Sequence, residues 1–318
     1  MGKISIVIPV YRGARTVGPL VERIEQELLG KRSIEIVLVN DGSPDDSAQV
    51  CRTLAVTRPH VLFLNLARNF TEHNAVMAGL NHATGEVIVI MDDDFQNPPH
   101  EILKLVAKID EGFDVVWSRY DRKEHSWWRN LGSRFNDYVA TLMLGKPRDL
   151  YLSSFKAMSR FTKDEVVRYT GPFPYLDGLI LRVTRNLTTV LCAHNVREEG
   201  KSGYTMRKLV SLWLNMFTNF SILPLRIASI AGLIVALIGA VFAVVFLIDR
   251  INNPQIAPGW TSLIVTLLII SGIQLVALGM IGEYLGRLFL KDNGRPQFVV
   301  RERIPSAVEA SRAQPLER

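Results

Sequence analysis

The chain has 318 residues, enough for one large domain with an additional segment. Its apolar fraction of 48% is high for a soluble protein, and the excess is concentrated between residues 222 and 290. The formal net charge of +6 is compatible with nucleic acid, but the basic residues cluster near the apolar segments and therefore favour anionic lipid. The two cysteines, Cys51 and Cys192, match no metal-ligand spacing and indicate free thiols in a reducing compartment.

Strand-like and helix-like patterns alternate along the first 118 residues. The apolar start of the chain does not have the charged, apolar and cleavage-site regions of a signal peptide, and it is interpreted as the first strand. The patterns predict strands at 4–10, 34–39, 61–65, 86–91 and 114–118, and helices at 16–29, 45–55, 72–82 and 100–111. Continuous apolar strands between amphipathic helices predict a parallel sheet covered on both faces. Ligands bind beyond the carboxyl ends of such strands, so the polar clusters at 40–43 and 92–97 are expected to share one edge.

Two uncharged apolar runs follow, at 227–248 and 261–282. Each approaches the roughly 20 residues that cross a bilayer as a helix. The short connection between them contains Pro254, Pro258 and Gly259, which predicts a transmembrane hairpin; two buried helices of a soluble core are the alternative, which the lack of charge disfavours. Basic residues lie mainly outside the hairpin, so the positive-inside rule predicts that the N-terminal domain and the tail are cytoplasmic.

Two further segments are amphipathic. Residues 206–220 place large apolar side chains on one helical face beside Arg207 and Lys208, which is typical of a helix in the membrane interface. A helix packed against the N-terminal domain is the alternative. Residues 125–144 have a similar character and could close over an acceptor. The tail after Pro305 is expected to be disordered.

The strongest local signal is the sequence MDDDFQNPP at residues 91–99. Three consecutive carboxylates at a strand end repel one another. A bound divalent cation would reduce this electrostatic repulsion. Mg²⁺ and Mn²⁺ prefer oxygen ligands, and alternation along an extended segment points Asp92 and Asp94 the same way. A solvated loop is the alternative for a bare Asp-x-Asp, but the preceding buried strand and the following Gln-Asn-Pro-Pro favour a metal site.

Several segments together resemble family 2 glycosyltransferases of the polyprenyl-phosphate type: SIVIPVY, VNDGS, ARNF, AVMAGLNHATGEVIVIMDDDFQNPP and REEGKSGYT. This group includes dolichyl-phosphate mannose synthases and bacterial undecaprenyl-phosphate glucose and aminoarabinose transferases. The resemblance covers essentially the whole chain, because the hairpin and the ending GEYLGRLF…KDNGRPQFVV are similar to the bacterial members. It implies a GT-A (Rossmann-like) α/β domain at 1–204, an interfacial helix at 205–221, a transmembrane hairpin at 222–290 and a cytoplasmic tail at 291–318, in a bacterial inner membrane.

The resemblance also implies roles for individual residues. The nucleotide-sugar site would consist of Pro9, Tyr11, Asp41, Arg68, Asn69, Asp92, Asp93, Lys201, Ser202 and Tyr204. Pro9 and Tyr11 would border the base, and Asp41 would hydrogen-bond it. Asp94 and Gln96, with Asp92, would bind the Mg²⁺ or Mn²⁺ that bridges the diphosphate. Arg197 would belong to the flexible segment that closes over the phosphates.

The acceptor side departs from the family pattern. Many relatives have an aspartate shortly before Phe-Arg, often treated as the catalytic base, but Ser154 takes that place in one alignment and Asp149 lies upstream as a substitute. An acceptor phosphate has a second pKa of about 6 and is already anionic near neutral pH, so a strong base is less necessary than positioning and relief of phosphate repulsion. Lys156, Arg160 and Arg197 are candidates for that relief, with a solvated surface charge as the alternative for each. Tyr11-Arg12-Gly13 also lacks the acid that many relatives carry near the base pocket.

The expected activity is inverting transfer of a single sugar from a nucleotide sugar to polyprenyl (undecaprenyl) phosphate, giving a lipid-linked donor for cell-envelope glycan or lipid A modification. UDP is the expected carrier, with GDP as the alternative. The sequence is also compatible with a different lipid acceptor, or with a catalytically silent scaffold that binds lipid-linked sugar. The resemblance further implies a homo-oligomer such as a tetramer, and no nucleic acid partner is expected. Glycines at 232, 239, 272 and 279 would permit close helix packing, and glycine that is merely tolerated in a membrane span is the alternative.

Overall fold

The computed structural model describes residues 2–120, 147, 150–195 and 259–307, together with positions 230, 232–235, 237–239, 241, 242, 244, 245, 248 and 252. The amphipathic segments 125–144 and 206–220 lie outside the described residues, as do Asp149, Arg197, Lys201, Ser202 and Tyr204. The contacts divide the chain into two compact units, Met1–Tyr204 with Arg295–Arg318, and Thr205–Gly294.

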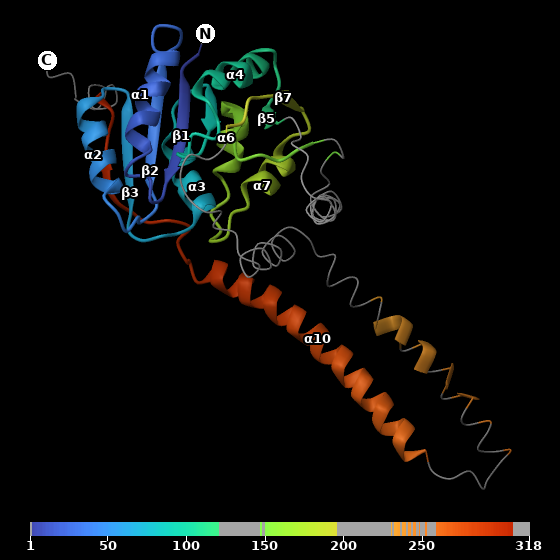
Figure 1. Ribbon diagram of the computed structural model, residues 1–318. Helices are drawn as coiled ribbons and strands as arrows, with labels where there is room; N and C mark the ends of the chain where they lie inside the picture. The colour runs from blue at the N-terminus through green and yellow to red at the C-terminus, as the bar shows by residue number, and fades with distance from the viewer. Residues whose placement is uncertain are drawn as a thin grey trace, which may run out of the picture. The chain divides into compact units, whose positions relative to one another are not determined.

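The first unit is built on an eight-stranded sheet in the order β7-β5-β6-β4-β1-β2-β3-β8 (Figure 1). The strands are β1 Ile4–Val10, β2 Ile34–Asn40, β3 Val61–Leu66, β4 Val87–Ile90, β5 Val115–Arg119, β6 Lys156–Ser159, β7 Leu187–Leu191 and β8 Val300–Ile304. The five strands predicted from the sequence all run in one direction. The expected parallel sheet is nevertheless mixed, because β6 lies antiparallel between β4 and β5, and β8 lies antiparallel along β3.

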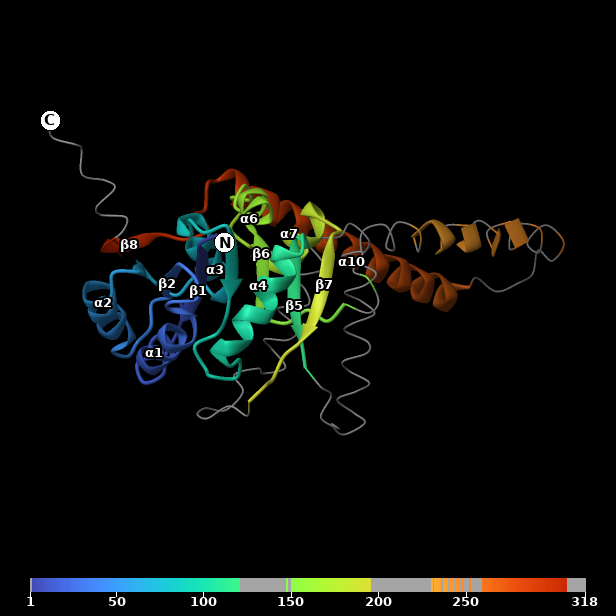
Figure 2. The ribbon, with the colours of Figure 1, turned by 90° about the horizontal axis from the view of Figure 1, so that it is seen from above.

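Helices cover both faces of this sheet. They are α1 Val17–Leu28, α2 Ser47–Thr57, α3 Glu72–His82, α4 Ile102–Asp110 after a 3-10 turn at Pro99–Glu101, α6 Arg160–Val166 and α7 Leu176–Val183. Figure 2 shows α1, α2 and α4 on one face and α3, α6 and α7 on the other. Alternation along β1 explains the two layers: Ile6 and Ile8 belong to the core under α1 and α4, whereas Val7 meets α3. A Cβ at Gly79 of α3 would lie 2.4 Å from Val7 Cγ1, so only glycine allows this close approach.

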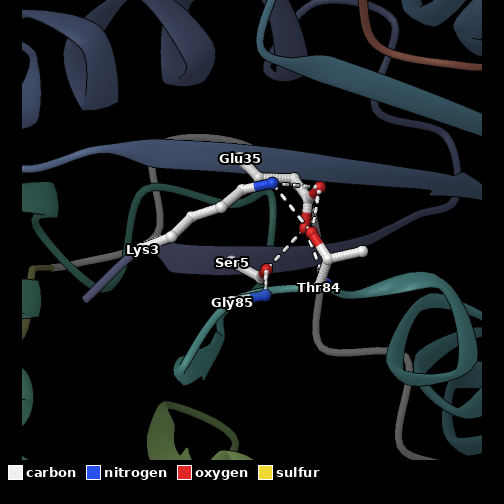
Figure 3. Close-up of polar contacts among 5 residues, drawn as sticks. All are labelled: Lys3, Ser5, Glu35, Thr84 and Gly85. Carbon is white, nitrogen blue, oxygen red and sulfur yellow. Dashed lines mark hydrogen bonds and ion pairs between the residues drawn. The ribbon is translucent and has the colours of Figure 1, made fainter. Parts of the chain in front are cut away.

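A buried carboxylate joins the amino ends of β1 and β2 to the turn that precedes β4 (Figure 3). Glu35 is 3% exposed and accepts hydrogen bonds from Lys3 Nζ at 2.8 Å, Ser5 Oγ at 2.5 Å and Thr84 N at 2.9 Å. Ser5 Oγ in turn accepts from Gly85 N at 2.8 Å. Burial alone would raise the pKa of Glu35, but the bonds from Lys3, Ser5 and Thr84 outweigh it and lower the pKa.

This network gives a stability prediction. Replacing Glu35 by glutamine is expected to lower the free energy of unfolding by about 2 kcal/mol near neutral pH, because it removes the negative charge that accepts hydrogen bonds from Lys3, Ser5 and Thr84. That corresponds to a melting temperature lower by about 4–8 °C, measured by thermal unfolding in detergent. Because the pKa of Glu35 is lower in the folded chain, its stabilisation is fully present above the ordinary carboxyl pKa of about 4.3 and is lost as the pH falls through the folded-state pKa.

The matched control is Glu27→Gln. Glu27 lies 4.0 Å from Lys31 on the exposed face of α1, so its loss is expected to change stability by less than about 0.5 kcal/mol. Equal melting temperatures for the Glu35 and Glu27 variants at neutral pH would contradict the assigned role of the network.

The carboxyl ends of the predicted strands meet at one edge of the sheet. Val10 of β1 lies opposite Asn40 of β2, which lies opposite Asn65 of β3, and Val7 lies opposite Ile90 of β4. The prediction that the clusters at 40–43 and 92–97 share an edge is therefore confirmed. β6 begins at the same edge, because Lys156 pairs with Ile90.

The second unit contains α10, Trp260–Asp292, a helix of 33 residues drawn in orange in Figure 1. Its stretch Ile269–Leu290 has a mean hydropathy of 1.5, is not buried, and is long and apolar enough to cross a membrane. The predicted span at 261–282 lies within α10. In the other predicted span, 227–248, the described positions are helical and the rest lie outside the described residues, so the hairpin stays a prediction.

Candidate active site at the carboxyl edge of the sheet

The loops after β1 and β2 are tied together by one aspartate. Arg12 N donates to Ser43 Oγ at 2.7 Å, and Gly13 N donates to Ser47 Oγ at 2.9 Å. Both hydroxyls donate to Asp45 Oδ1 at 2.5 Å. Burial acts to raise the pKa of Asp45, but these hydrogen bonds outweigh it and lower the pKa. The two loops therefore form one fixed wall of the edge.

Pro9 and Tyr11, the predicted neighbours of the base, lie on that wall. Pro9 is the second-to-last residue paired in β1, opposite Val39 of β2. Tyr11 follows the strand and is 47% exposed. An exposed aromatic ring beyond a strand end is available for stacking on a planar ligand.

Asp41 fixes the next loop along the edge. Its carboxylate is 3% exposed and accepts a hydrogen bond from Phe70 N at 2.7 Å, while Asn69 Nδ2 donates to its carbonyl at 3.2 Å. Gly42 has a φ of +58°, and a Cβ there would lie 2.4 Å from the carbonyl carbon of Arg68. Burial raises the pKa of Asp41, although hydrogen bonds from the Phe70 backbone oppose this. Asp41 therefore holds the loop after β3 in place, a structural role in addition to its predicted hydrogen bond to the base.

The loop after β3 presents two polar side chains at the edge. Arg68 and Asn69 are exposed, and the Arg68 guanidinium lies 4.1 Å from the centre of the Phe70 ring, a cation–π contact. Phe70 itself is buried. The backbone of this loop is thus anchored while its cation remains accessible to an anionic ligand.

The three consecutive aspartates after β4 have different surroundings. Asp92 Oδ2 accepts a hydrogen bond from Ser154 Oγ at 2.6 Å. The Asp93 carboxylate lies against the β1 loop, since a Cβ at Gly13 would be 1.9 Å from its Oδ2. Asp94 Oδ1 accepts from Gln96 N at 3.2 Å, which closes a tight turn. The positive φ of Phe95, 58°, lies within that turn.

The carboxylates at this edge repel one another. Burial raises the pKa of Asp92 to about 6, and the charges of Glu72 and Asp94 add to that rise. Burial also raises the pKa of Glu72, with the charges of Asp177 and Asp94 acting the same way. Lys156 opposes the rise at both groups. A bound cation would relieve this repulsion.

The donor set fits a hard divalent cation shared with a substrate. Asp92, Asp94 and Gln96 offer oxygen ligands at one strand end, the type that Mg²⁺ and Mn²⁺ prefer. Among the described residues, no three His, Cys, Asp or Glu side chains converge into a metal cluster. Mg²⁺ is usually held by one or two carboxylates together with phosphate oxygens, and Asp92 and Asp94 are two such carboxylates.

Lys156 is placed beside these carboxylates but carries a partner of its own. It is 3% exposed, and its ammonium donates to Asp177 Oδ1. Trp117 Nε1 donates to the same oxygen at 3.1 Å. Asp177, at the start of α7, is 8% exposed. Because its ammonium is buried and already paired, Lys156 affects the neighbouring carboxylates through its electrostatic field.

The loop after β7 closes the edge beside Gln96. Asn195 N donates to Gln96 O at 2.9 Å, and the Gln96 side chain lies 3.5 Å from His194 Nε2. The Tyr120 ring packs 4.2 Å from the His194 ring and its hydroxyl donates to Asn97 Oδ1 at 2.6 Å. Burial raises the pKa of Tyr120 to about 12, so the hydroxyl stays protonated as a donor. Asn195, the last described residue before the segment predicted to close over phosphates, therefore lies next to a predicted metal ligand.

Comparison with known proteins identifies the family. Residues 5–174 match glycosyl transferase family 2. The chain belongs to this family. It is 36% identical over 304 residues to an undecaprenyl-phosphate 4-deoxy-4-formamido-L-arabinose transferase of Enterobacter sp. (strain 638), covering 94% of this chain and 92% of that protein. The protein of the same description from Proteus mirabilis (strain HI4320) is 33% identical over 306 residues, 95% of this chain and 94% of that protein.

The fold of this glycosyltransferase has a counterpart among solved structures. The M. tuberculosis glucosyl-3-phosphoglycerate synthase superposes with a TM-score of 0.50 at 16% identity, covering 67% of this chain and 79% of that chain. The predicted GT-A-like α/β domain and the predicted family are therefore confirmed, and the chain is a glycosyltransferase.

The sequence predicted most of the residues at the edge of this glycosyltransferase, but missed two acidic ones. Asp41, Arg68, Asp92 and Asp94 follow three different strands and meet at the edge, and their roles stay predictions. Glu72, in the first turn of α3, and Asp177 were not predicted. The only signal for Asp177 was a carboxylate within the otherwise apolar segment 176–181, which is a weak one.

Proposed function

We propose that this glycosyltransferase moves a single sugar, with inversion, from a UDP-sugar to undecaprenyl phosphate, giving a lipid-linked donor for cell-envelope glycan or lipid A modification. The observation that carries the proposal is the match along 94% of the chain to a relative named for transfer of 4-deoxy-4-formamido-L-arabinose to that lipid phosphate. The long apolar stretch of α10 supports a membrane-embedded acceptor.

On the donor side, the proposed nucleotide site lies along the loops after β1, β2 and β3. Pro9 and Tyr11 would border the base, and Asp41 would hydrogen-bond it. Arg68 and Asn69 would face the sugar diphosphate, because both are exposed on the loop that follows β3 at the carboxyl edge of the sheet. Asp93, with Lys201, Ser202 and Tyr204 of the segment that follows Asn195, would complete the site.

Asp94 and Gln96, with Asp92, would hold the Mg²⁺ or Mn²⁺. When bound, the ion supplies positive charge that stabilises the nucleoside diphosphate leaving group. Ser154 orients the Asp92 carboxylate through its hydrogen bond of 2.6 Å. Burial raises the pKa of Asp92 to about 6, and the charge of Lys156 opposes that rise and so favours the ionised carboxylate that a cation binds.

On the acceptor side, a phosphate oxygen would attack the anomeric carbon as the bond to the diphosphate oxygen breaks. The acceptor is anionic near neutral pH, so the chain mainly has to position it and offset the repulsion between the two phosphate groups. Arg197 would provide that offset at the phosphates. Lys156 would act on the phosphates through its electrostatic field and without direct contact, because it is bound to Asp177. Asp149 remains the proposed candidate for a base.

For membrane placement, we propose a cytoplasmic catalytic domain at 1–204, an interfacial helix at 205–221, a hairpin at 222–290 and a cytoplasmic tail at 291–318 in a bacterial inner membrane. The strands and helices of the first unit and the apolar helix α10 support this division. Assembly into a homo-oligomer, such as a tetramer, belongs to the same proposal.

The test is transfer from a panel of radiolabelled nucleotide sugars to undecaprenyl phosphate by the purified protein in detergent with Mg²⁺ or Mn²⁺. The expected product is soluble in chloroform and labile to mild acid, as a sugar phosphodiester is, and EDTA is expected to prevent its formation. Parallel reactions offer diacylglycerol as acceptor. Product with diacylglycerol alone, or no product from any donor, would refute the proposed acceptor.

A further inference from the structure

The chain after α10 returns to the sheet as a C-terminal strap, defined as residues 295–307. The strap belongs to the same compact unit as the sheet. Its strand β8, red in Figure 2, runs antiparallel to β3, with Ile304 opposite Phe63, Arg303 opposite Leu64 and Glu302 opposite Asn65. β8 therefore covers what would otherwise be the open edge of β3, the strand that leads into the Arg68–Asn69 loop.

A β-bulge interrupts this pairing where β3 ends. Asn65 lies opposite Glu302, but the next residue, Leu66, lies opposite Val300. Arg301 is thus the additional residue on the strap side. Bulges re-aim a side chain and increase local twist, and they occur next to active sites.

The bulge brings the strap onto Ala67, the residue directly before Arg68. Ala67 N donates to Val299 O at 2.8 Å. Arg301 Nη2 donates to Ala67 O at 3.2 Å. Both peptide groups of Ala67 are therefore bound to the strap at the point where the chain leaves β3 for the donor loop.

The donor loop is consequently held from two sides. Asp41 binds its far part through Phe70 N at 2.7 Å and Asn69 Nδ2 at 3.2 Å. The strap binds its near part through Ala67. Arg68 lies between these two anchors with an exposed side chain, and Asn69, also exposed, belongs to the Asp41 anchor. Fixing both ends lowers the conformational entropy that a ligand must remove when it binds the loop.

The strap has anchors that do not involve Arg301. Arg52 of α2 forms a two-pronged ion pair with Glu302, at 2.9 and 2.7 Å. Gln297, 8% exposed, donates from Nε2 to Gly171 O at 2.9 Å and Tyr169 O at 3.2 Å. Arg295 lies 5.3 Å from the Phe173 ring centre. A change confined to the Arg301 side chain therefore leaves the strap attached.

We propose that the C-terminal strap is a positioning element of the donor site and that Arg301 is its positioning residue. By binding the carbonyl of Ala67, Arg301 fixes the backbone that presents Arg68 and Asn69 to the nucleotide diphosphate. The proposal rests on the proposed function, since it takes these two residues as donor ligands. It predicts an effect on donor affinity with little effect on the chemical step.

The test compares Arg301→Gln with Arg303→Gln. Arg303 is an exposed arginine on the same strand, but it lies opposite Leu64 within β3, away from the loop. Arg301→Gln is expected to weaken binding of UDP in the presence of Mn²⁺, measured by calorimetry, by about fivefold, and to raise the KM for the donor similarly with kcat within about twofold. Arg303→Gln is expected to match the wild type.

Hydrogen exchange supplies a readout that needs no ligand. Exchange of the amides at 67–70, followed by mass spectrometry, is expected to be about tenfold faster in Arg301→Gln and unchanged in Arg303→Gln. Unchanged exchange or unchanged UDP affinity in Arg301→Gln would overturn the proposal, as would equal losses in both variants. A wild type that makes no lipid-linked sugar, with both Arg301 effects present, would refute the proposed function and leave the positioning role supported.

Discussion

Replacing Asp94 by alanine is expected to reduce sugar transfer by about a thousandfold, because it removes a ligand of the ion that stabilises the leaving diphosphate. The structure supports this choice on electrostatic grounds. Asp94 raises the pKa of Asp92 and Glu72, so these groups are close enough to repel and a cation would relieve the repulsion. The direct readout is Mn²⁺ affinity in the presence of UDP, followed by electron paramagnetic resonance, which is expected to fall about thirtyfold or more.

The control for this variant is Asp110→Asn. Asp110 is the last residue of α4, and its side chain is 42% exposed. Its replacement by asparagine removes one carboxylate without changing a residue at the carboxyl edge of the sheet. It is expected to keep wild-type turnover and Mn²⁺ affinity. An Asp94→Ala protein that is folded, binds Mn²⁺ as the wild type does and transfers sugar at the normal rate would remove Asp94 from the metal site.

The central part of this fold was predictable because its strands are continuous apolar runs. β1 and α3 have the predicted bounds, Ile4–Val10 and Glu72–His82. β6 has only four residues and begins with Lys156, which hid it from pattern analysis. β8, with the sequence VRERI, alternates charged and apolar residues, as an edge strand does. Its pairing with β3 depends on contacts between residues more than 200 positions apart, which local patterns do not contain.

The candidate site was predictable to the same extent and for a related reason. Asp41 and Asp92 follow apolar strands, so the topology alone brings them together. The environment of Lys156 was not predictable, because the sequence does not show that Asp177 of a later helix comes to lie beside it. The sequence suggested a cation facing a phosphate, whereas the structure shows a buried ion pair. Whether a lysine is free or paired depends on tertiary packing that its neighbours in the sequence do not determine.

Replacing Lys156 alone by methionine is expected to lower the free energy of unfolding by about 3–5 kcal/mol, because it leaves the Asp177 carboxylate buried without its cation. Trp117 Nε1, at 3.1 Å, would still donate to the Asp177 oxygen that Lys156 binds. The double variant Lys156→Met, Asp177→Leu is expected to recover most of this loss, since a pair of apolar side chains of similar volume has no uncompensated charge. Chemical unfolding in detergent measures both values, and a single variant as stable as the wild type would contradict the pairing.

The double variant also separates stability from catalysis. Burial raises the pKa of Asp92 and Glu72 in the wild type, and the charge of Lys156 opposes the rise at both groups. Removal of this charge is therefore expected to raise the pKa of Asp92 further, so that ionised Asp92 becomes available for a cation only at higher pH. At Glu72 the simultaneous loss of the Asp177 charge, which raises that pKa in the wild type, opposes the change. The acidic limb of the pH–rate profile should move to higher pH by about one unit, while a folded, stable protein remains. A profile that coincides with that of the wild type would mean that Lys156 serves packing alone, and that its field has no part in preparing the carboxylates for the metal and the donor.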